Sequence, residues 1–341
     1  MANVFPALLA SPCRRLIPTL VAVALFALPG CSTLSEEEEE KLDNHRRNAL
    51  TYLQTEEFLR AIQQSEMGLE IDENDYALLA TRALARGYLA GDVYGRLVAA
   101  EPLFDDVYGL RSANEHQPLF LLEYAKVKQR VAAEQRRQAA RAAEESNDPT
   151  LSNAIRSEKA GRATALSEES SSRSTAASDA LLVLIERQEL VRTANRVLMA
   201  IAAERGDGPG SIEYATKAIA RLEEQKASLL NDIEKDLDLR RTLRAREALE
   251  DLIVEEKLIR SRLSAIYFQQ ELFAESVQQL DIILDLDPNR SFDYFNRAKA
   301  HQALGNRSKA VDDYQNFLST TDLPASDDKV RQAYEYTQIL P

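Results

Sequence analysis

Two adjacent stretches near the C-terminus decide the fold: Lys257–Arg290 (KLIRSRLSAIYFQQELFAESVQQLDIILDLDPNR) and Ser291–Pro324 (SFDYFNRAKAHQALGNRSKAVDDYQNFLSTTDLP). Aligned, they are offset by 34 residues and agree in side-chain size at four positions. Positions 8 and 20 are small and positions 24 and 27 are large: Ser264 and Ala298, Ser276 and Ala310, Leu280 and Tyr314, Ile283 and Phe317. Small residues let the two helices of a hairpin approach closely, and large ones fill the space beside them. The pattern predicts two stacked helical hairpins.

This pattern resembles the tetratricopeptide (TPR) repeat, which has the same period. Leu42–Asp75 fits the same frame, with Ala49 at position 8 and Ala61 at position 20. A looser copy begins at Tyr76. The resemblance implies N-terminal TPR-like repeats over residues 42–115, in addition to the C-terminal pair.

The composition agrees with a helical chain. Only 11 of the 341 residues are Gly and 11 are Pro, while Ala, Leu, Glu, Arg and Gln, which favour helices, are abundant. No segment shows the sustained alternation typical of strands. The expected fold class is all-α, with helix-turn-helix TPR-like repeats flanking a bundle or hairpin of long helices and with α-solenoid character. The net charge of -13 disfavours nucleic acid as a partner, because phosphates would be repelled.

Residues 116–256, between the repeats, are expected to form a long-helix, coiled-coil-like region. Residues 119–146 contain no Gly or Pro, and one helix of this length would run about 42 Å. Asn147-Asp148-Pro149 is expected to end it.

Further along this region, six Ser residues within 165–178 predict a flexible turn. Apolar residues from Leu181 to Ile201 share one helical stripe, which Gly206–Gly210 would close. A similar stripe from Ile212 to Leu237 predicts another amphipathic helix, so that these helices would pack as an antiparallel bundle or hairpin.

Residues 1–30 have the layout of a secretory signal that is removed by cleavage. Arg14-Arg15 precedes an apolar run at 16–28, which is shorter than the ~20 residues that a membrane-spanning helix needs. Leu28-Pro29-Gly30-Cys31 resembles the bacterial lipobox, in which the Cys is acylated with chains such as palmitate and the chain is cut just before it. Pro29 departs from the small residue usual there. The resemblance implies lipidation at Cys31.

Ser32 follows this Cys, and in lipoproteins of this kind the absence of Asp there favours the outer membrane. The expected location is the inner leaflet of the bacterial outer membrane, facing the periplasm. An ordinary cleaved signal with an incidental Cys is the alternative. Residues 31–41, which include five consecutive Glu, are expected to form a solvated tether behind the anchor.

Motifs that carry chemistry are missing from the sequence. No phosphate-binding loop, HExxH, CxxC or GxSxG occurs, and the three His lie in separate segments: His45, His116 and His301. The sequence therefore predicts no enzyme activity, no cofactor and no metal site.

In the TPR family the first helices of the repeats line a concave groove that receives a partner's helix, extended segment or terminus. Carried over by position, the resemblance implies a groove that includes Arg46, Leu50, Leu53, Phe268, Phe292, Phe295, Lys299 and Gln302. Phe292 and Phe295 would supply contact area, and Lys299 would meet an acidic group. The alternative is that both Phe pack against the preceding repeat.

These inferences predict a lipid-anchored, periplasm-facing TPR scaffold that binds another envelope protein during assembly or secretion. The layout is similar to that of TPR lipoproteins that serve pilus, secretin and outer-membrane barrel assembly. Two alternatives stay open: a transporter-associated periplasmic TPR lipoprotein that holds a small ligand, and a structural spacer. A closed apolar pore would favour the ligand carrier, and an open groove would favour the scaffold.

The last segment, 325–341, is expected to cap the repeat stack. An open array exposes an apolar face at its end unless an element with one polar side covers it. Val330, Ala333 and Tyr334 fall on one face of the predicted helix. We therefore expect this face to pack near Tyr314 and Phe317.

Overall fold

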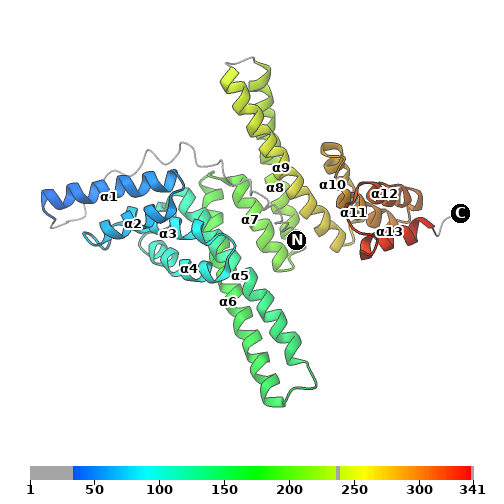
Figure 1. Ribbon diagram of the computed structural model, residues 1–341, viewed down its shortest axis with the longest axis horizontal. Helices are drawn as coiled ribbons and strands as arrows, with labels where there is room; N and C mark the ends of the chain where they lie inside the picture. The colour runs from blue at the N-terminus through cyan, green and yellow to red at the C-terminus, as the bar shows by residue number, and fades with distance from the viewer. Residues whose placement is uncertain (1–33, 236–238, 339–341) are drawn as a thin grey trace, which may run out of the picture. The chain divides into compact units, whose positions relative to one another are not determined.

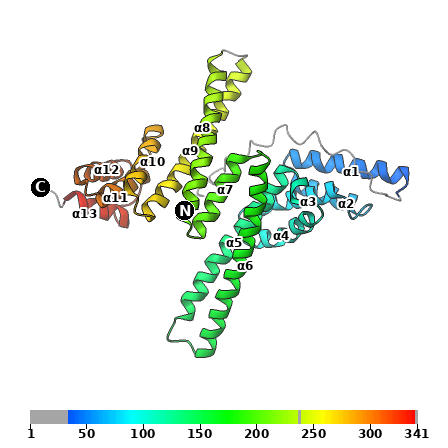
Figure 2. The same cartoon turned by 180° about the vertical axis from the view of Figure 1, so that it is seen from behind.

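The computed structural model describes residues 34–235 and 239–338, and all of their regular structure is helical (Figures 1 and 2). The all-α prediction is thereby confirmed. The chain divides into two compact units, residues 1–184 (unit 1) and 185–341 (unit 2). The predicted signal and Cys31 lie outside the described residues.

Unit 1 contains two short hairpins followed by one long hairpin. Its helices are α1 (Glu36–Gln54), α2 (Phe58–Leu69), α3 (Tyr76–Ala90), α4 (Tyr94–Gly109), the short 3-10 helix η2 (Ala113–Glu115), α5 (Pro118–Ser146) and α6 (Asn153–Glu186), whose last two residues pass the unit boundary. Unit 2 contains α7 (Val191–Glu204), α8 (Gly208–Glu234), α9 (Leu239–Gln269), α10 (Phe273–Leu286), α11 (Ser291–Ala303), α12 (Arg307–Thr320) and α13 (Asp328–Gln338).

Four hairpins, α1/α2, α7/α8, α9/α10 and α11/α12, turn in the same way. Each has one residue with φ between 60° and 75° at repeat position 15: Glu56, Gly206, Glu271 and Gly305. The next backbone N–H donates to the carbonyl five residues earlier, at 2.8–2.9 Å, in all four. This is the 6→1 bond of a Schellman turn, which satisfies a free carbonyl at the end of the first helix. The four hairpins are therefore copies of one local structure.

The small residues at positions 8 and 20 explain how the helices of these hairpins approach. Ala49 and Ala61 are fully buried, as are Ala298 and Ala310. In two hairpins the residue at position 20 is a serine, which bonds to the backbone of the first helix. Ser276 Oγ donates to Ser264 O at 2.9 Å, and Ser211 Oγ donates to Met199 O at 2.8 Å. The α7/α8 pair is thus a TPR-like hairpin that the sequence analysis missed.

The Ser-rich stretch 165–178 is helical, so the predicted turn is wrong. It lies within α6, and the connection between the long helices is at 147–152 instead. Ser170 and Ser174 are buried, and Ser170 Oγ donates to Ala132 O on α5 at 2.9 Å. Small hydroxyl side chains let α5 and α6 approach, so Ser170 and Ser174 mark a helix interface rather than a break.

The single helix expected from Leu181 to Ile201 is interrupted. α6 ends at Glu186, and Gln188 and Leu190 adopt positive φ values of 57° and 48° before α7 begins. The unit boundary also falls here, within residues 116–256. The predicted central region is therefore two long hairpins in different units, α5/α6 and α8/α9.

The acidic run at the N-terminus belongs to α1, so the tether expected over 31–41 is wrong from Glu36 onward. Ser35 caps the helix: Glu38 N donates to Ser35 Oγ at 3.3 Å, and Ser35 N donates to Glu38 Oε2 at 2.9 Å. Carboxylates in the first turn interact favourably with the helix dipole. The glutamates that would repel one another in an extended tether therefore stabilise the start of α1.

The C-terminal cap is present, with one correction. Val330 and Ala333 of α13 are buried in a cluster with Tyr314 and Phe317. Tyr334, which was expected to point inward, is half-exposed, and Tyr336 lies against Tyr314 instead, with ring centroids 5.1 Å apart.

A buried ionic cluster holds the long hairpin of unit 1. Glu101 of α4 accepts from Lys128 Nζ of α5 at 2.9 Å and from Arg173 Nε of α6 at 2.8 Å. Lys128 also contacts Asp105 at 2.7 Å, and Arg173 contacts Glu169 at 3.0 Å. Removal of charges from water is costly unless they are paired, so the cluster fixes how these three helices meet.

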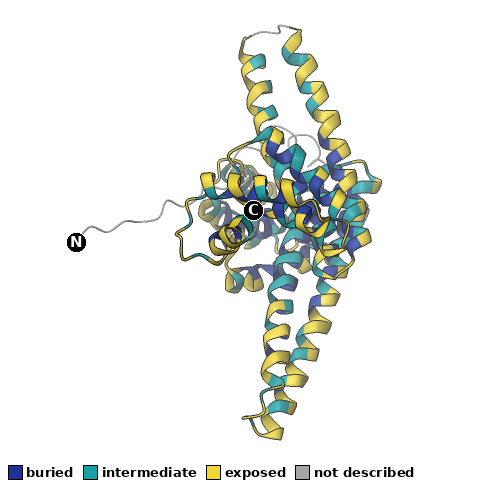
Figure 3. Cartoon of the chain, turned by 90° about the vertical axis from the view of Figure 1, so that its right-hand side faces the viewer, coloured by how far each residue is buried: buried dark blue, intermediate teal, exposed yellow. Residues whose placement is uncertain are grey.

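A second cluster stands at the base of α8/α9 in unit 2. Glu256 is buried and accepts from Arg260 Nε at 2.8 Å and from Lys226 Nζ at 2.6 Å. Arg260 Nη2 also donates to Glu223 at 2.8 Å. Beyond these clusters the distal halves of both long hairpins are mostly exposed (Figure 3). We call the distal part of α8/α9, residues 226–256, the arm.

Candidate partner-binding groove

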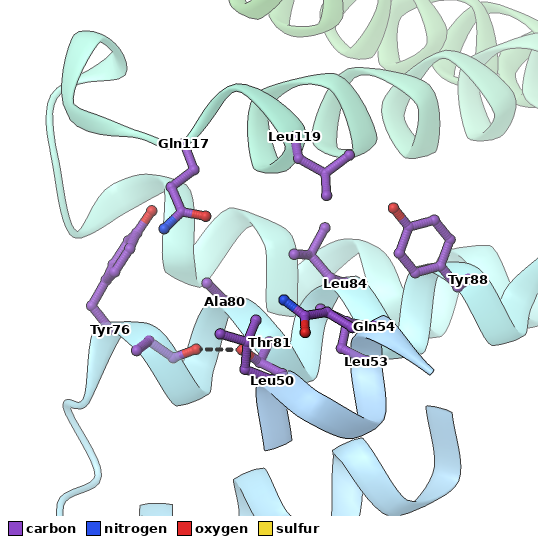
Figure 4. Close-up of a pocket in the computed structure, with 11 residues that line it drawn as sticks. Leu50, Leu53, Gln54, Tyr76, Ala80, Thr81, Leu84, Tyr88, Gln117 and Leu119 are labelled. Carbon is purple, nitrogen blue, oxygen red and sulfur yellow. Dashed lines mark hydrogen bonds between the residues drawn. The ribbon is translucent and has the colours of Figure 1, made fainter. Parts of the chain in front are cut away.

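A groove in unit 1 lies between α1, α3 and the start of α5. Eleven residues line it: Leu50, Leu53, Gln54, Tyr76, Ala77, Ala80, Thr81, Leu84, Tyr88, Gln117 and Leu119 (Figure 4). The contributing helices are the first helices of successive hairpins, so the groove is on the face where a TPR-like array is expected to bind partners. Its free volume is about 30 Å³, and it is partly open to solvent.

The floor of the groove is apolar. Leu53 and Leu84 are buried, and Ala77 and Ala80 are half-buried with side chains too small to fill the space above them. Thr81 Oγ1 donates to Ala77 O at 2.7 Å, which satisfies its hydroxyl proton. The floor therefore suits apolar side chains of a partner.

The rim is aromatic and polar. Tyr76 Oη lies 3.1 Å from His116 Nδ1, and the Arg111 guanidinium lies 3.6 Å from the centroid of the Tyr76 ring. Burial raises the pKa of Tyr76, although the Arg111 charge opposes this, so the phenol is neutral at pH 7. The rim also carries the amides of Gln54 and Gln117, which can bond to a peptide backbone.

Of the three predicted N-terminal groove residues, Leu50 and Leu53 line the groove, whereas Arg46 is held in ion pairs. Arg46 Nε donates to Asp75 at 2.7 Å, and Nη1 donates to Asp43 at 2.6 Å. Burial would lower the pKa of Arg46, but these carboxylates raise it above its usual value. Asp75 also caps α3 by accepting from Leu78 N at 2.8 Å. Arg46 thus holds α1 against the start of α3.

The predicted residues in unit 2 divide into core and surface. Phe295 is buried against Tyr314 and Phe317, with centroids 5.7 and 5.1 Å away, so its place on a groove surface is wrong. Both rings belong to α12 of its own hairpin, not to the preceding repeat that the alternative named. Phe292 is 49% exposed, with Lys329 Nζ 5.8 Å from its ring centroid.

Three more predicted residues lie on α9 and α11. Lys299 Nζ is 5.5 Å from the centroid of Phe268, which also packs edge-on against Phe273. Gln302 Oε1 accepts from Tyr314 Oη at 3.1 Å. The structure therefore brings Phe268 and Lys299 together, whereas Arg46 and Leu50 belong to the other unit. Partner binding by these residues stays a prediction.

Sequence reasoning missed most of the unit 1 groove. Its central row is Tyr76, Ala80, Leu84 and Tyr88, all on one face of α3. The signal was present, because these residues are spaced four apart. The looser match of the second repeat to the TPR frame kept this face from being assigned.

Within residues 34–235 and 239–338 no cluster of three or more His, Cys, Asp or Glu is arranged to hold a metal ion. Over the same ranges no helix is both long and apolar enough to cross a membrane.

Comparisons with known proteins give a fold likeness and no family. No protein-family model matches the chain, and no curated protein matches it. A structure described as a functional characterisation of pilF from Pseudomonas aeruginosa is 13% identical, with a TM-score of 0.47, over 88% of this chain and 99% of that one.

Two further structures are similar at comparable sequence identity. The C-terminal part of a TPR repeat-containing protein from Cytophaga hutchinsonii is 12% identical, with a TM-score of 0.48, over 86% of this chain and 95% of that one. A tetratricopeptide repeat protein from Parabacteroides merdae is 12% identical, with a TM-score of 0.34, over 88% and 99%. The TPR-like character of this chain therefore depends on its own repeated turns and small-residue contacts.

Proposed function

We propose that this chain is a lipid-anchored, periplasm-facing scaffold that holds another envelope protein by a segment seated in the groove of unit 1. The observation that carries the proposal is the groove itself, with an apolar floor around Ala80 and a rim of amides and aromatic rings. Such a surface fits an extended or helical segment that places an apolar side chain on the floor. Because the groove is open to solvent, it supports a scaffold rather than a sealed ligand carrier.

Site-specific photo-crosslinking in bacterial cells tests the binding. A photoreactive amino acid at Ala80 of the full chain should yield a discrete protein adduct, and Leu50→Asp in the same chain should reduce it at least tenfold, because a carboxylate on the floor would be desolvated by the partner. Leu59, which is strongly exposed on α2, is the matched control position. The same adducts at Leu59 and Ala80, or none at Ala80, would contradict the proposal.

The anchor has a separate test. Acylation of Cys31 by two or three chains would give stable membrane attachment. Cys31→Ala should therefore leave the precursor uncut or release the protein from membranes. Wild-type protein that is soluble and carries no lipid mass on its N-terminal peptide would refute the anchor while leaving the groove untouched.

A further inference from the structure

The loop between α4 and α5, residues 110–117, is anchored in unit 1 by one buried side chain. His116 is 1% exposed, whereas the other residues of this loop are exposed or half-buried. Its neighbour Gln117 is the N-cap residue of α5 and lines the groove of unit 1. The position of this part of the groove therefore depends on how His116 is held.

Three aromatic rings surround the imidazole of His116. Tyr108 of α4 stacks on it with ring centroids 5.1 Å apart, Phe120 of α5 lies at 5.1 Å, and Tyr76 of α3 lies at 5.9 Å. Tyr76 and Gln117 lie at the same end of the groove (Figure 4). The imidazole therefore connects the loop to three helices at this end of the groove.

The hydrogen bonds of His116 fit the neutral imidazole. Nε2 lies 3.1 Å from Tyr108 O, and Nδ1 lies 3.1 Å from Tyr76 Oη. A carbonyl oxygen can only accept, so Nε2 carries the one proton of the neutral ring, and Nδ1 accepts from the Tyr76 hydroxyl. The neutral form thus satisfies both ring nitrogens and fixes the Tyr76 side chain at the rim of the groove.

A second proton on the ring disrupts this arrangement. Protonated Nδ1 is a donor that faces the Tyr76 hydroxyl, which must then turn its own proton away. The Arg111 guanidinium, 3.6 Å from the centroid of the Tyr76 ring, is a further positive charge beside the same side chain. Because the imidazolium would be enclosed by rings and kept from water, its burial is costly. Acidification therefore favours a state in which His116 leaves the ring cluster.

The electrostatic surroundings of His116 agree with this conclusion. Burial lowers its pKa below the usual value, and the Arg111 charge adds to this effect. The carbonyl oxygens of Tyr108 and Arg111 and the carboxylate of Glu115 favour the protonated form but do not outweigh burial. The neutral ring is therefore the form present at pH 7.

The other titratable groups around the ring keep their charge state between pH 5 and 8. Burial raises the pKa of both Tyr76 and Tyr108, so these phenols stay neutral. The groups that face the ring or stack on its neighbours are Tyr76 of α3, Tyr108 of α4, Arg111 and Glu115 of the loop, and Tyr124 of α5. Among them His116 is the group whose charge changes in this range.

We propose that His116 makes the groove of unit 1 sensitive to pH: the neutral imidazole holds Tyr76 and the 110–117 loop in place, and its protonation frees them and weakens binding of the partner segment. The proposal rests on the function proposed above for this groove. Because the segment binds the form with neutral His116, it competes with one proton. Its affinity should therefore fall by up to about tenfold for each pH unit below the pKa of His116 in the free chain.

The protonation state is measured by NMR of the full chain in detergent, with histidine labelled with 13C and 15N. The chain contains three His, so His45→Gln and His301→Gln assign the signals of His116. The ring should be protonated at Nε2 at pH 7.5 and titrate below the usual 6.5. Tyr76→Phe should raise this pKa, because it removes the donor to Nδ1. A pKa of 6.5 or above, or a neutral ring protonated at Nδ1, would overturn the proposal.

The shape of the groove is followed without a partner. An environment-sensitive fluorescent amino acid at Ala80, one helical turn from Tyr76, should change its emission between pH 7.5 and pH 5. His116→Gln keeps a donor and an acceptor but takes up no proton, so it should abolish the change. His301→Gln, which removes the buried imidazole of unit 2, is the matched control and should preserve it. An unchanged wild-type emission, the same change in His116→Gln, or loss of helical circular dichroism at pH 5 would contradict local control by His116.

Binding is tested by photo-crosslinking at Ala80 in isolated envelopes at pH 7.5 and pH 5. The adduct should decrease several-fold at pH 5 in the wild type and less than twofold in His116→Gln. Equal losses in both chains would show that another group titrates and would refute the proposal. Absence of an adduct at both pH values would refute the function proposed for the groove, while the emission at Ala80 still decides whether His116 controls its shape.

Discussion

The buried Glu101 carboxylate should be one of the most sensitive positions in unit 1. It lies between two cations, with Lys128 Nζ at 2.9 Å and Arg173 Nε at 2.8 Å from Oε1. Glu101→Leu would leave both cations buried without their shared acceptor. Such changes cost about 3–5 kcal/mol, and we expect about 3 because Lys128 keeps Asp105 and Arg173 keeps Glu169.

Urea unfolding followed by circular dichroism measures this effect, since the chain contains no Trp. With a slope of roughly 2 kcal/mol per molar urea, Glu101→Leu should lower the midpoint of unit 1 by about 1.5 M. The control is Glu66→Leu, which removes an exposed ion pair with Arg86 and should cost at most about 1 kcal/mol.

A double variant separates the ion pair from simple loss of packing. Glu101→Leu combined with Lys128→Met removes both charges and replaces them by apolar side chains. It should cost at least about 1 kcal/mol less than the sum of the single changes. A midpoint shift below about 0.3 M for Glu101→Leu, or strict additivity in the double variant, would refute the reasoning.

Three further outcomes are expected. Tyr336→Ala should destabilise unit 2 by about 2 kcal/mol because it removes the ring that packs against Tyr314. Tyr334→Ala should change the free energy of unfolding by less than about 0.5 kcal/mol, because Tyr334 is half-exposed. Equal effects of the two changes in chemical denaturation would contradict the assignment of Tyr336, rather than Tyr334, to the core. Limited proteolysis should cut first at 147–152, not within 165–178. Burial would raise the pKa of Glu256, but hydrogen bonds from Lys226 and Arg260 lower it below its usual value. The ionised carboxylate therefore contributes its full stabilisation above the unfolded pKa of about 4.3, and this stabilisation is lost as pH falls further. Glu256→Gln should then flatten the dependence of the urea midpoint on pH below about 5.

The sequence sufficed for the repeats that follow each other at the regular period. The hairpin turns within 42–75 and 257–324 fall where the small-residue pattern placed them, and the small Ala298 and Ala310 are fully buried where the two helices approach. The α7/α8 hairpin was not predicted, because its position 8, Met199, lies 65 residues before Ser264 instead of the regular 34. Gly206 at position 15 and Ser211 at position 20 were its readable signals.

Side-chain roles were less predictable than helix positions. The TPR resemblance places Phe295 in the groove, yet it packs in a core with residues of α12 and α13. The serines within 165–178 have turn-forming chemistry in isolation, but a facing helix makes small polar side chains useful inside a hairpin. These outcomes depend on neighbours that are remote in sequence, which local composition does not reveal.

The arm of unit 2 leaves the stack of hairpins and returns to it without disturbing the repeat frame. It adds 31 residues between the end of one regular repeat and the start of the next, and the cluster around Glu256 closes its base. The length of the arm can therefore change without a change in the repeats on either side of it. One helical turn added to both helices of the arm would move its outer leucines about 5.4 Å farther from the stack of hairpins. The distance that the arm spans can thus change while the repeats stay the same.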